Sequence, residues 1–206
     1  MAAEVAPASL LRYPAGTMES YSMPEALPDI PLTRINGAPD SLGAHRGTVL
    51  LIVNTASQCG LTPQYAGLEE LQRSYADRGF TVLAFPANDF GAQEPGADEA
   101  IAQFCEVNYR TSFPLFSKAS VVGPDKQPLY AALVAAAPGK TGDAATFRER
   151  LRGHGMIPNE DPEVLWNFEK FLVNRDGTVA ARFAPAVAPD DPQLIAAIEG
   201  ALSASA

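Results

Sequence analysis

Cysteine and histidine are both scarce in this chain. Its 206 residues include two cysteines, Cys59 and Cys105, and two histidines, His45 and His154. Two cysteines in a chain of this length do not make a disulfide framework, which indicates a reducing compartment. These four residues show no metal-ligand spacing, so we expect solvated histidines and no metal site.

The chain also lacks an excess of positive charge and any long apolar segment. It has 15 Lys and Arg against 24 Asp and Glu, and this net charge of −9 argues against binding to nucleic acid or anionic lipid. No apolar run approaches the roughly 20 residues of a membrane span. Residues 1–9 lack the charged and apolar regions of a secretory signal. We therefore expect a cytoplasmic protein that does not insert into membranes.

What the chain does contain is the composition of a globular protein. With 47% hydrophobic residues, it is long enough for one well-packed domain and rather short for two. Residues 1–26 are rich in Ala, Pro, Ser and Met without periodicity, so we expect a flexible arm there. Residues 27–206 are expected to form a single domain.

Strand and helix patterns alternate along this domain. Residues 30–35 alternate and lead into Asn36-Gly37, which predicts an N-terminal β-hairpin. Apolar runs predict strands at 47–54, 80–86, 168–173 and 178–183, and other periodic or Ala-rich segments predict helices at 63–78, 98–108, 129–136 and 190–203. This order predicts an α/β fold: a parallel strand pair, a later antiparallel hairpin, and a central mixed β-sheet flanked by helices on both faces.

Residues 138–164 interrupt this pattern. The segment is rich in Gly, Pro and charged residues and contains one short helix candidate at 146–152. We therefore expect an insertion on the domain surface.

Cys59 is the residue where chemistry is most expected. It lies between the apolar run Leu50-Leu51-Ile52-Val53 and the helix predicted from Pro63. Unpaired N–H groups and the helix dipole at such a junction favour the thiolate, which is the reactive form of cysteine. From position alone, Cys59 is either a reactive thiol or a small apolar residue of the core.

Three sequence blocks make the chain similar to a known family. They are Asn54-Thr55-Ala56-Ser57-Gln58-Cys59-Gly60-Leu61-Thr62, the segment from Phe85 to Pro95, and the segment from Trp166 to Leu172. In this order they resemble the glutathione peroxidase family, a branch of the thioredoxin fold, over residues from about Ile30 to Leu202. The resemblance implies a thioredoxin-like fold.

The resemblance also implies roles for four residues. Cys59 matches the peroxidatic position, and Gln93, Trp166 and Asn167 match the polar residues around it. Their neutral N–H groups would stabilise a thiolate and then the charge that moves onto the peroxide oxygen. The implied enzyme reduces hydrogen peroxide and organic or lipid hydroperoxides through a sulfenic acid on Cys59, in the response to oxidative stress, without metal, haem or flavin.

The thiol that resolves this sulfenic acid is left open by the sequence. Cysteine-type relatives that use thioredoxin carry a resolving cysteine in the helix that contains Cys105. However, Cys105 lies one residue before the expected position, a turn of about 100° on a helix, and shares an apolar face with Ile101 and Phe104. Cys105 is thus either resolving or structural. Ala87 stands where many relatives have another cysteine, and Thr62 replaces the second cysteine of a thioredoxin-type motif.

Thioredoxin is the expected reductant, with glutathione as the alternative. Glutathione-specific members hold its carboxylates with basic residues, and here the candidates near the motifs are few, with Arg182 and Lys170 as two that could contribute. A peroxide-sensing relay that passes oxidation to a partner protein by disulfide exchange would use the same residues. The 138–164 insertion is similar in place to the loop that builds subunit contacts in oligomeric members, so it predicts either a homo-oligomer or a solvated loop.

Overall fold

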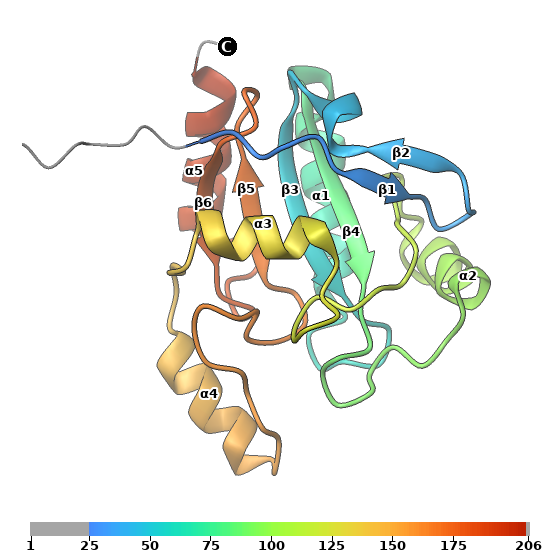
Figure 1. Cartoon of the computed structure of the whole chain (residues 1–206), viewed down its shortest axis with the longest axis vertical. Helices are drawn as coiled ribbons and strands as arrows, with labels where there is room; N and C mark the ends of the chain where they lie inside the picture. The colour runs from blue at the N-terminus through green and yellow to red at the C-terminus, as the bar shows by residue number, and fades with distance from the viewer. Residues whose placement is uncertain (1–24, 205–206) are drawn as a thin grey trace, which may run out of the picture.

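A four-stranded mixed sheet forms the centre of the computed structural model, which describes residues 25–204 (Figure 1). The strands are β3 (Val49–Thr55), β4 (Phe80–Pro86), β5 (Lys170–Val173) and β6 (Val179–Phe183), in the order β4-β3-β5-β6. β3 pairs parallel with β4 and antiparallel with β5, and β6 is antiparallel to β5. The predicted mixed sheet is confirmed. The expected arm at 1–26 lies almost wholly outside the described residues.

β3 is central because its sequence is apolar on both faces. All seven of its residues are buried, as the apolar run from Leu50 to Val53 predicts. The polar residues Asn54 and Thr55 end the strand and are fully buried as well. The chain therefore leaves the middle of the sheet with polar groups already inside the protein, and the Cys59 loop begins there.

Helices cover both faces of the sheet. α3 (Pro128–Ala136) crosses the front face in Figure 1 and α1 (Gln64–Tyr75) lies behind β4, while α5 (Pro192–Ser203) packs against β3, β5 and β6. α1 continues into the short helix η2 (Ala76–Arg78), which ends at Gly79 with a left-handed φ of 79°. α2 (Asp98–Tyr109) packs against α1 beside the edge strand β4.

The N-terminal hairpin is also as predicted. β1 (Pro31–Thr33) and β2 (Pro39–Ser41) pair antiparallel, and the short helix η1 (Leu42–His45) follows. No helix in residues 25–204 combines the length and the apolar character that crossing a membrane requires.

The insertion contains one helix, α4 (Ala144–Gly153), at the end of the sheet where β3 and β4 finish (Figure 1). The helix is longer than the predicted 146–152 because Asp143 caps it, accepting a hydrogen bond from the Thr146 N–H at 3.0 Å. Both ends of the insertion are tied to the sheet by Arg182 in β6. Its guanidinium donates to the carbonyl oxygens of Ala137 and Pro162 at 2.8 and 2.9 Å. The insertion is therefore fixed onto the domain.

Candidate active site

Cys59 lies in a tight loop between β3 and α1. Its N–H donates to Thr62 Oγ1 at 3.0 Å, and the Thr62 hydroxyl donates to the Ala56 carbonyl at 2.8 Å. The Leu61 N–H points at the Cys59 sulfur, with 3.4 Å between N and Sγ. α1 itself begins only at Gln64, so the N–H group beside the sulfur comes from this loop and not from the first helical turn. A backbone N–H at this distance is a hydrogen-bond donor for the sulfur.

Gln93 is brought to Cys59 by the loop that follows β4. The Gln58 N–H donates to the Gln93 carbonyl at 3.0 Å, and Ser57 Oγ donates to the carboxylate of Glu94 at 3.0 Å. The loop turns at Gly91 and Ala92, which have φ values of 63° and 52°. A left-handed alanine is strained, and such strain gathers at functional sites where the surroundings hold it.

Trp166 and Asn167 come from the segment between the insertion and β5. Asn54, at the end of β3, donates from Nδ2 to the Trp166 carbonyl at 3.1 Å and accepts the Phe168 N–H at 2.7 Å through its own carbonyl. Phe168 has a φ of 66° and is the second non-glycine residue beside the site, after Ala92, with a left-handed backbone. The fully buried Asn54 thus sets the position of the segment that contains Trp166 and Asn167.

The structure places three of the four expected residues on one cavity. Cys59, Gln93 and Trp166 line a cavity of about 310 Å³. Asn167 is fully buried behind Gln93, and its Nδ2 donates to Gln93 Oε1 at 2.9 Å. The Gln93 oxygen is therefore occupied by Asn167, which leaves the N–H groups of Gln93 for the cavity. In this arrangement Asn167 orients a donor and is not itself a wall of the cavity.

The insertion supplies the rest of the cavity wall. Five of the lining residues come from α4 and the loop after it, namely Phe147, Arg150, Leu151, His154 and Met156, and Gly60 and Leu61 complete it. The sequence pattern predicted a helix in this segment, but nothing in that pattern indicated that the helix would pack beside Cys59. The buried residues Asn54 and Glu94 belong to the first and second sequence blocks. Their roles in positioning the site depend on contacts between distant segments, which the sequence does not reveal.

The basic residues considered for glutathione binding lie elsewhere. Arg182 is buried in an ion pair with Glu169 at 2.5 Å, and Lys170 is fully buried and donates to the Phe168 carbonyl at 2.6 Å. Neither side chain lines the Cys59 cavity. The basic groups that do line it are Arg150 and His154, which lie outside the three sequence blocks and so were not predicted to belong to the site.

Cys105 lies in α2 and does not line the cavity. Its side chain is fully buried, and burial raises the pKa of the Cys105 thiol to about 11, partly opposed by the nearby Tyr65 hydroxyl. A thiol with this pKa is protonated and unreactive at neutral pH while the helix stays closed. Both cysteines are free.

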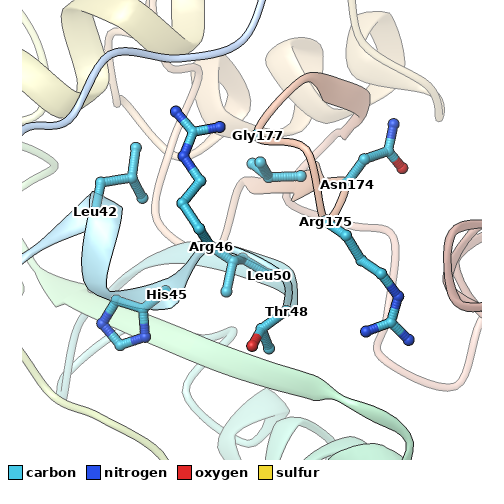
Figure 2. A pocket seen from close by; sticks show the side chains of 9 residues that line it. Leu42, His45, Arg46, Thr48, Leu50, Asn174, Arg175 and Gly177 are labelled. Carbon is cyan, nitrogen blue, oxygen red and sulfur yellow. The ribbon is translucent and has the colours of Figure 1, made fainter. Parts of the chain in front are cut away.

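A second hollow lies at the opposite end of the sheet, before β3 begins. It is lined by residues of η1, its following loop and the β5–β6 turn, including His45, Arg46 and Arg175 (Figure 2). Its volume is about 10 Å³, room for little more than one water molecule. Arg46 donates to the carbonyls of Leu27 and Asp176, so this hollow belongs to the structural packing of the turn. Residues 25–204 contain no cluster of three or more metal-ligating side chains.

Comparison with known proteins gives a consistent result. The model of the family described as glutathione peroxidase matches residues 29–134. The chain is 48% identical over 170 residues to "Thioredoxin/glutathione peroxidase BtuE" of Escherichia coli, covering 82% of this chain and 93% of that protein. It is 48% identical over 157 residues to "Hydroperoxy fatty acid reductase gpx1" of Synechocystis, covering 76% and 85%.

Solved structures agree on the fold. The crystal structure of Trgpx in apo form has a TM-score of 0.62 and 32% identity, over 86% of this chain and 96% of that one. A thioredoxin-family thiol:disulfide interchange protein from Chlorobium tepidum has a TM-score of 0.56 at 15% identity, over 89% and 100%, which shows the fold alone. The chain thus belongs to the glutathione peroxidase family and is a peroxidase with a thioredoxin-like fold.

Proposed function

We propose that the protein is a thiol-dependent peroxidase that reduces hydrogen peroxide and organic or lipid hydroperoxides in the response to oxidative stress. The observation that supports this most directly is the single cavity shared by Cys59, Gln93 and Trp166, with the Leu61 N–H at the sulfur. Three neutral N–H donors can then stabilise negative charge without forming an ion pair that would lower the nucleophilicity of the thiolate.

The reaction proceeds by attack of the Cys59 thiolate on the terminal oxygen of the hydroperoxide. The S–O bond forms as the O–O bond breaks, and the electron pair leaves with the other peroxide oxygen, the one bound to H or to the organic group, which takes a proton to become water or an alcohol. Cys59 is left as a sulfenic acid. In this proposal the N–H groups of Gln93 and Trp166 stabilise the charge that develops on this oxygen, because both residues line the cavity of Cys59, and Asn167 orients Gln93 through the hydrogen bond between them.

Reduction of the sulfenic acid requires two thiols in sequence. The first condenses with it to a disulfide and releases water, and the second reduces that disulfide by exchange. We propose thioredoxin as the donor, with glutathione as the alternative. Cys105 could serve as the first thiol only if α2 opens, since disulfide formation needs Cα atoms within roughly 7 Å.

The test is consumption of hydroperoxide with thioredoxin, thioredoxin reductase and NADPH. We expect Cys59→Ser to abolish turnover, and undiminished turnover in this variant would refute the proposal. The alternative function, a peroxide-sensing relay, predicts a single oxidation followed by a trapped disulfide with a partner protein instead of steady turnover.

Mass spectrometry after one equivalent of peroxide decides the role of Cys105. A Cys59–Cys105 disulfide supports resolution within the chain. A lone sulfenic acid at Cys59, in a protein that still turns over with thioredoxin, assigns Cys105 to the core. Cys105→Ser should then retain full activity.

The insertion is proposed as a subunit contact on the basis of Ile157. This residue follows the cavity residue Met156 and is 91% exposed, which is unusual for a large apolar side chain. Light scattering should show an oligomer that Ile157→Asp dissociates, and a monomeric wild-type protein at all concentrations tested would contradict this.

A further inference from the structure

Arg150 differs from the other basic residues of the insertion. Residues 138–164 contain four Lys and Arg side chains, and three of them are paired with carboxylates. Arg148 pairs with Asp161 at 3.1 Å, Arg152 pairs with Glu160 at 2.7 Å, and Lys140 pairs with Asp161. Within residues 25–204, Arg150 makes no ion pair and its guanidinium carbon lies over the Phe147 ring, 4.9 Å from the centroid. Arg150 is thus an exposed cation that stacks on an aromatic ring and has no carboxylate partner among the described residues.

This unpaired cation faces the cavity of the reactive sulfur. Arg150 and Cys59 both line the same 310 Å³ space, which is at the lower end of the roughly 300–1,000 Å³ range of small-molecule sites. Apart from the imidazole of His154, the rest of the wall is mainly apolar, formed by Leu61, Phe147, Leu151, Met156 and Trp166, and it contains no carboxylate. A ligand that fills the cavity would meet an apolar surface, one guanidinium and the imidazole of His154 in addition to the catalytic donors.

We infer that Arg150 binds the carboxylate of the hydroperoxide substrate, so that the enzyme prefers amphiphilic hydroperoxy acids to neutral hydroperoxides. The inference rests on the proposed peroxidase function and names the substrate class of that same site. The apolar part of such a molecule packs on the insertion while its peroxide group reaches Cys59. With a chain charge of −9, an anion needs a local cation to be held at this surface.

The thiol reductant is the other source of a carboxylate at this position. Glutathione has two carboxylates and an ammonium group, whereas the cavity offers one guanidinium beside the imidazole of His154, no carboxylate for the ammonium group and a mostly apolar wall. The lining therefore matches a hydroperoxy acid better than a zwitterionic tripeptide. The two sources differ in which kinetic constant depends on Arg150.

The experiment compares a medium-chain hydroperoxy acid with its methyl ester, both below the concentration at which they form micelles. In the wild-type enzyme we expect kcat/KM for the acid to exceed that for the ester by about 3- to 10-fold, and this ratio to fall with added salt. Arg150→Gln should bring the ratio close to one, Arg150→Lys should restore part of it, and Arg150→Glu should invert it. Because each ratio is measured within one enzyme, changes in the shared chemistry cancel.

Arg152→Gln is the matched control, since Arg152 lies on the same helix but pairs with Glu160 outside the cavity. It should keep the wild-type ratio. An acid-to-ester ratio of one in the wild-type enzyme, or a ratio that Arg150→Gln leaves unchanged, overturns the inference. A selective rise in KM for glutathione in Arg150→Gln assigns the guanidinium to the reductant instead. If the wild-type enzyme consumes no hydroperoxide, the proposed function fails together with the inference, whereas turnover with an acid-to-ester ratio of one removes the inference alone.

Discussion

Lys170 allows the sharpest test of the core that supports the active site. The side chain is fully buried between the Phe168 and Pro185 carbonyls, to which Nζ donates at 2.6 and 3.4 Å. Burial lowers the pKa of Lys170 from 10.5 to about 7, and the neighbouring Glu169 carboxylate opposes only part of this shift. In the unfolded chain the same amine stays protonated up to its ordinary pKa. Between about pH 7 and 10 the unfolded state therefore binds more protons than the folded state, and the stability contribution of Lys170 rises with pH.

The magnitude follows from the shift. One proton of difference gives a slope of about 1.4 kcal/mol per pH unit, so the free energy of unfolding should gain about 2–3 kcal/mol from Lys170 between roughly pH 7.5 and 9.5. Lys170→Met has no group that titrates there. The difference in stability, wild type minus Lys170→Met, should therefore increase by this amount over the same range.

Urea unfolding followed by the fluorescence of Trp166 measures this difference at several pH values. Val173→Ala is a suitable control because Val173 is a buried residue of the same strand without a titratable group. It should lower stability through lost packing while its curve stays parallel to that of the wild type. If the Lys170→Met curve is also parallel to the wild type, the amine does not change its protonation on folding and the reasoning is wrong.

Three further predictions concern the site and its support. Asn167→Ala should lower kcat/KM for hydrogen peroxide by about 10-fold. Because Asn167 acts through Gln93, a double-mutant cycle with Gln93→Ala should be strongly non-additive, and additive losses would contradict this. Glu169→Gln leaves the buried Arg182 without its carboxylate and should reduce the free energy of unfolding by about 3–5 kcal/mol in urea titrations, so a change below about 1 kcal/mol would be inconsistent with a fully buried pair. Gly177 has a φ of 87°, and Gly177→Ala places a Cβ 1.6 Å from the Arg46 guanidinium. The variant should lower the free energy of unfolding by about 1–3 kcal/mol in calorimetry, and an unchanged stability would contradict this.

Local sequence patterns predict most of the elements because each signal is complete within a few residues. The strand predicted at 80–86 is observed at Phe80–Pro86, since an apolar run lies between Gly79 and the end of the strand at Pro86. The helix predicted at 98–108 is observed at Asp98–Tyr109, where two acidic residues begin it. The family blocks likewise name residues of the site, and three of the four line one cavity.

Contacts between distant segments were not predictable in this way, and Arg182 shows why. Arginine is mostly exposed in proteins, and the sequence offered Arg182 as a candidate for binding the carboxylates of glutathione. The insertion covers that end of the sheet, and Arg182 then satisfies the carbonyls at both ends of the insertion while Glu169 balances its charge. The same Glu169 carboxylate accepts a hydrogen bond at 2.8 Å from the N–H of Leu165, the residue that precedes Trp166. A buried ion pair thus joins the ends of the insertion to the segment of Trp166 and Asn167, so the same pair anchors the two segments that supply Arg150 and Trp166 to the cavity of Cys59.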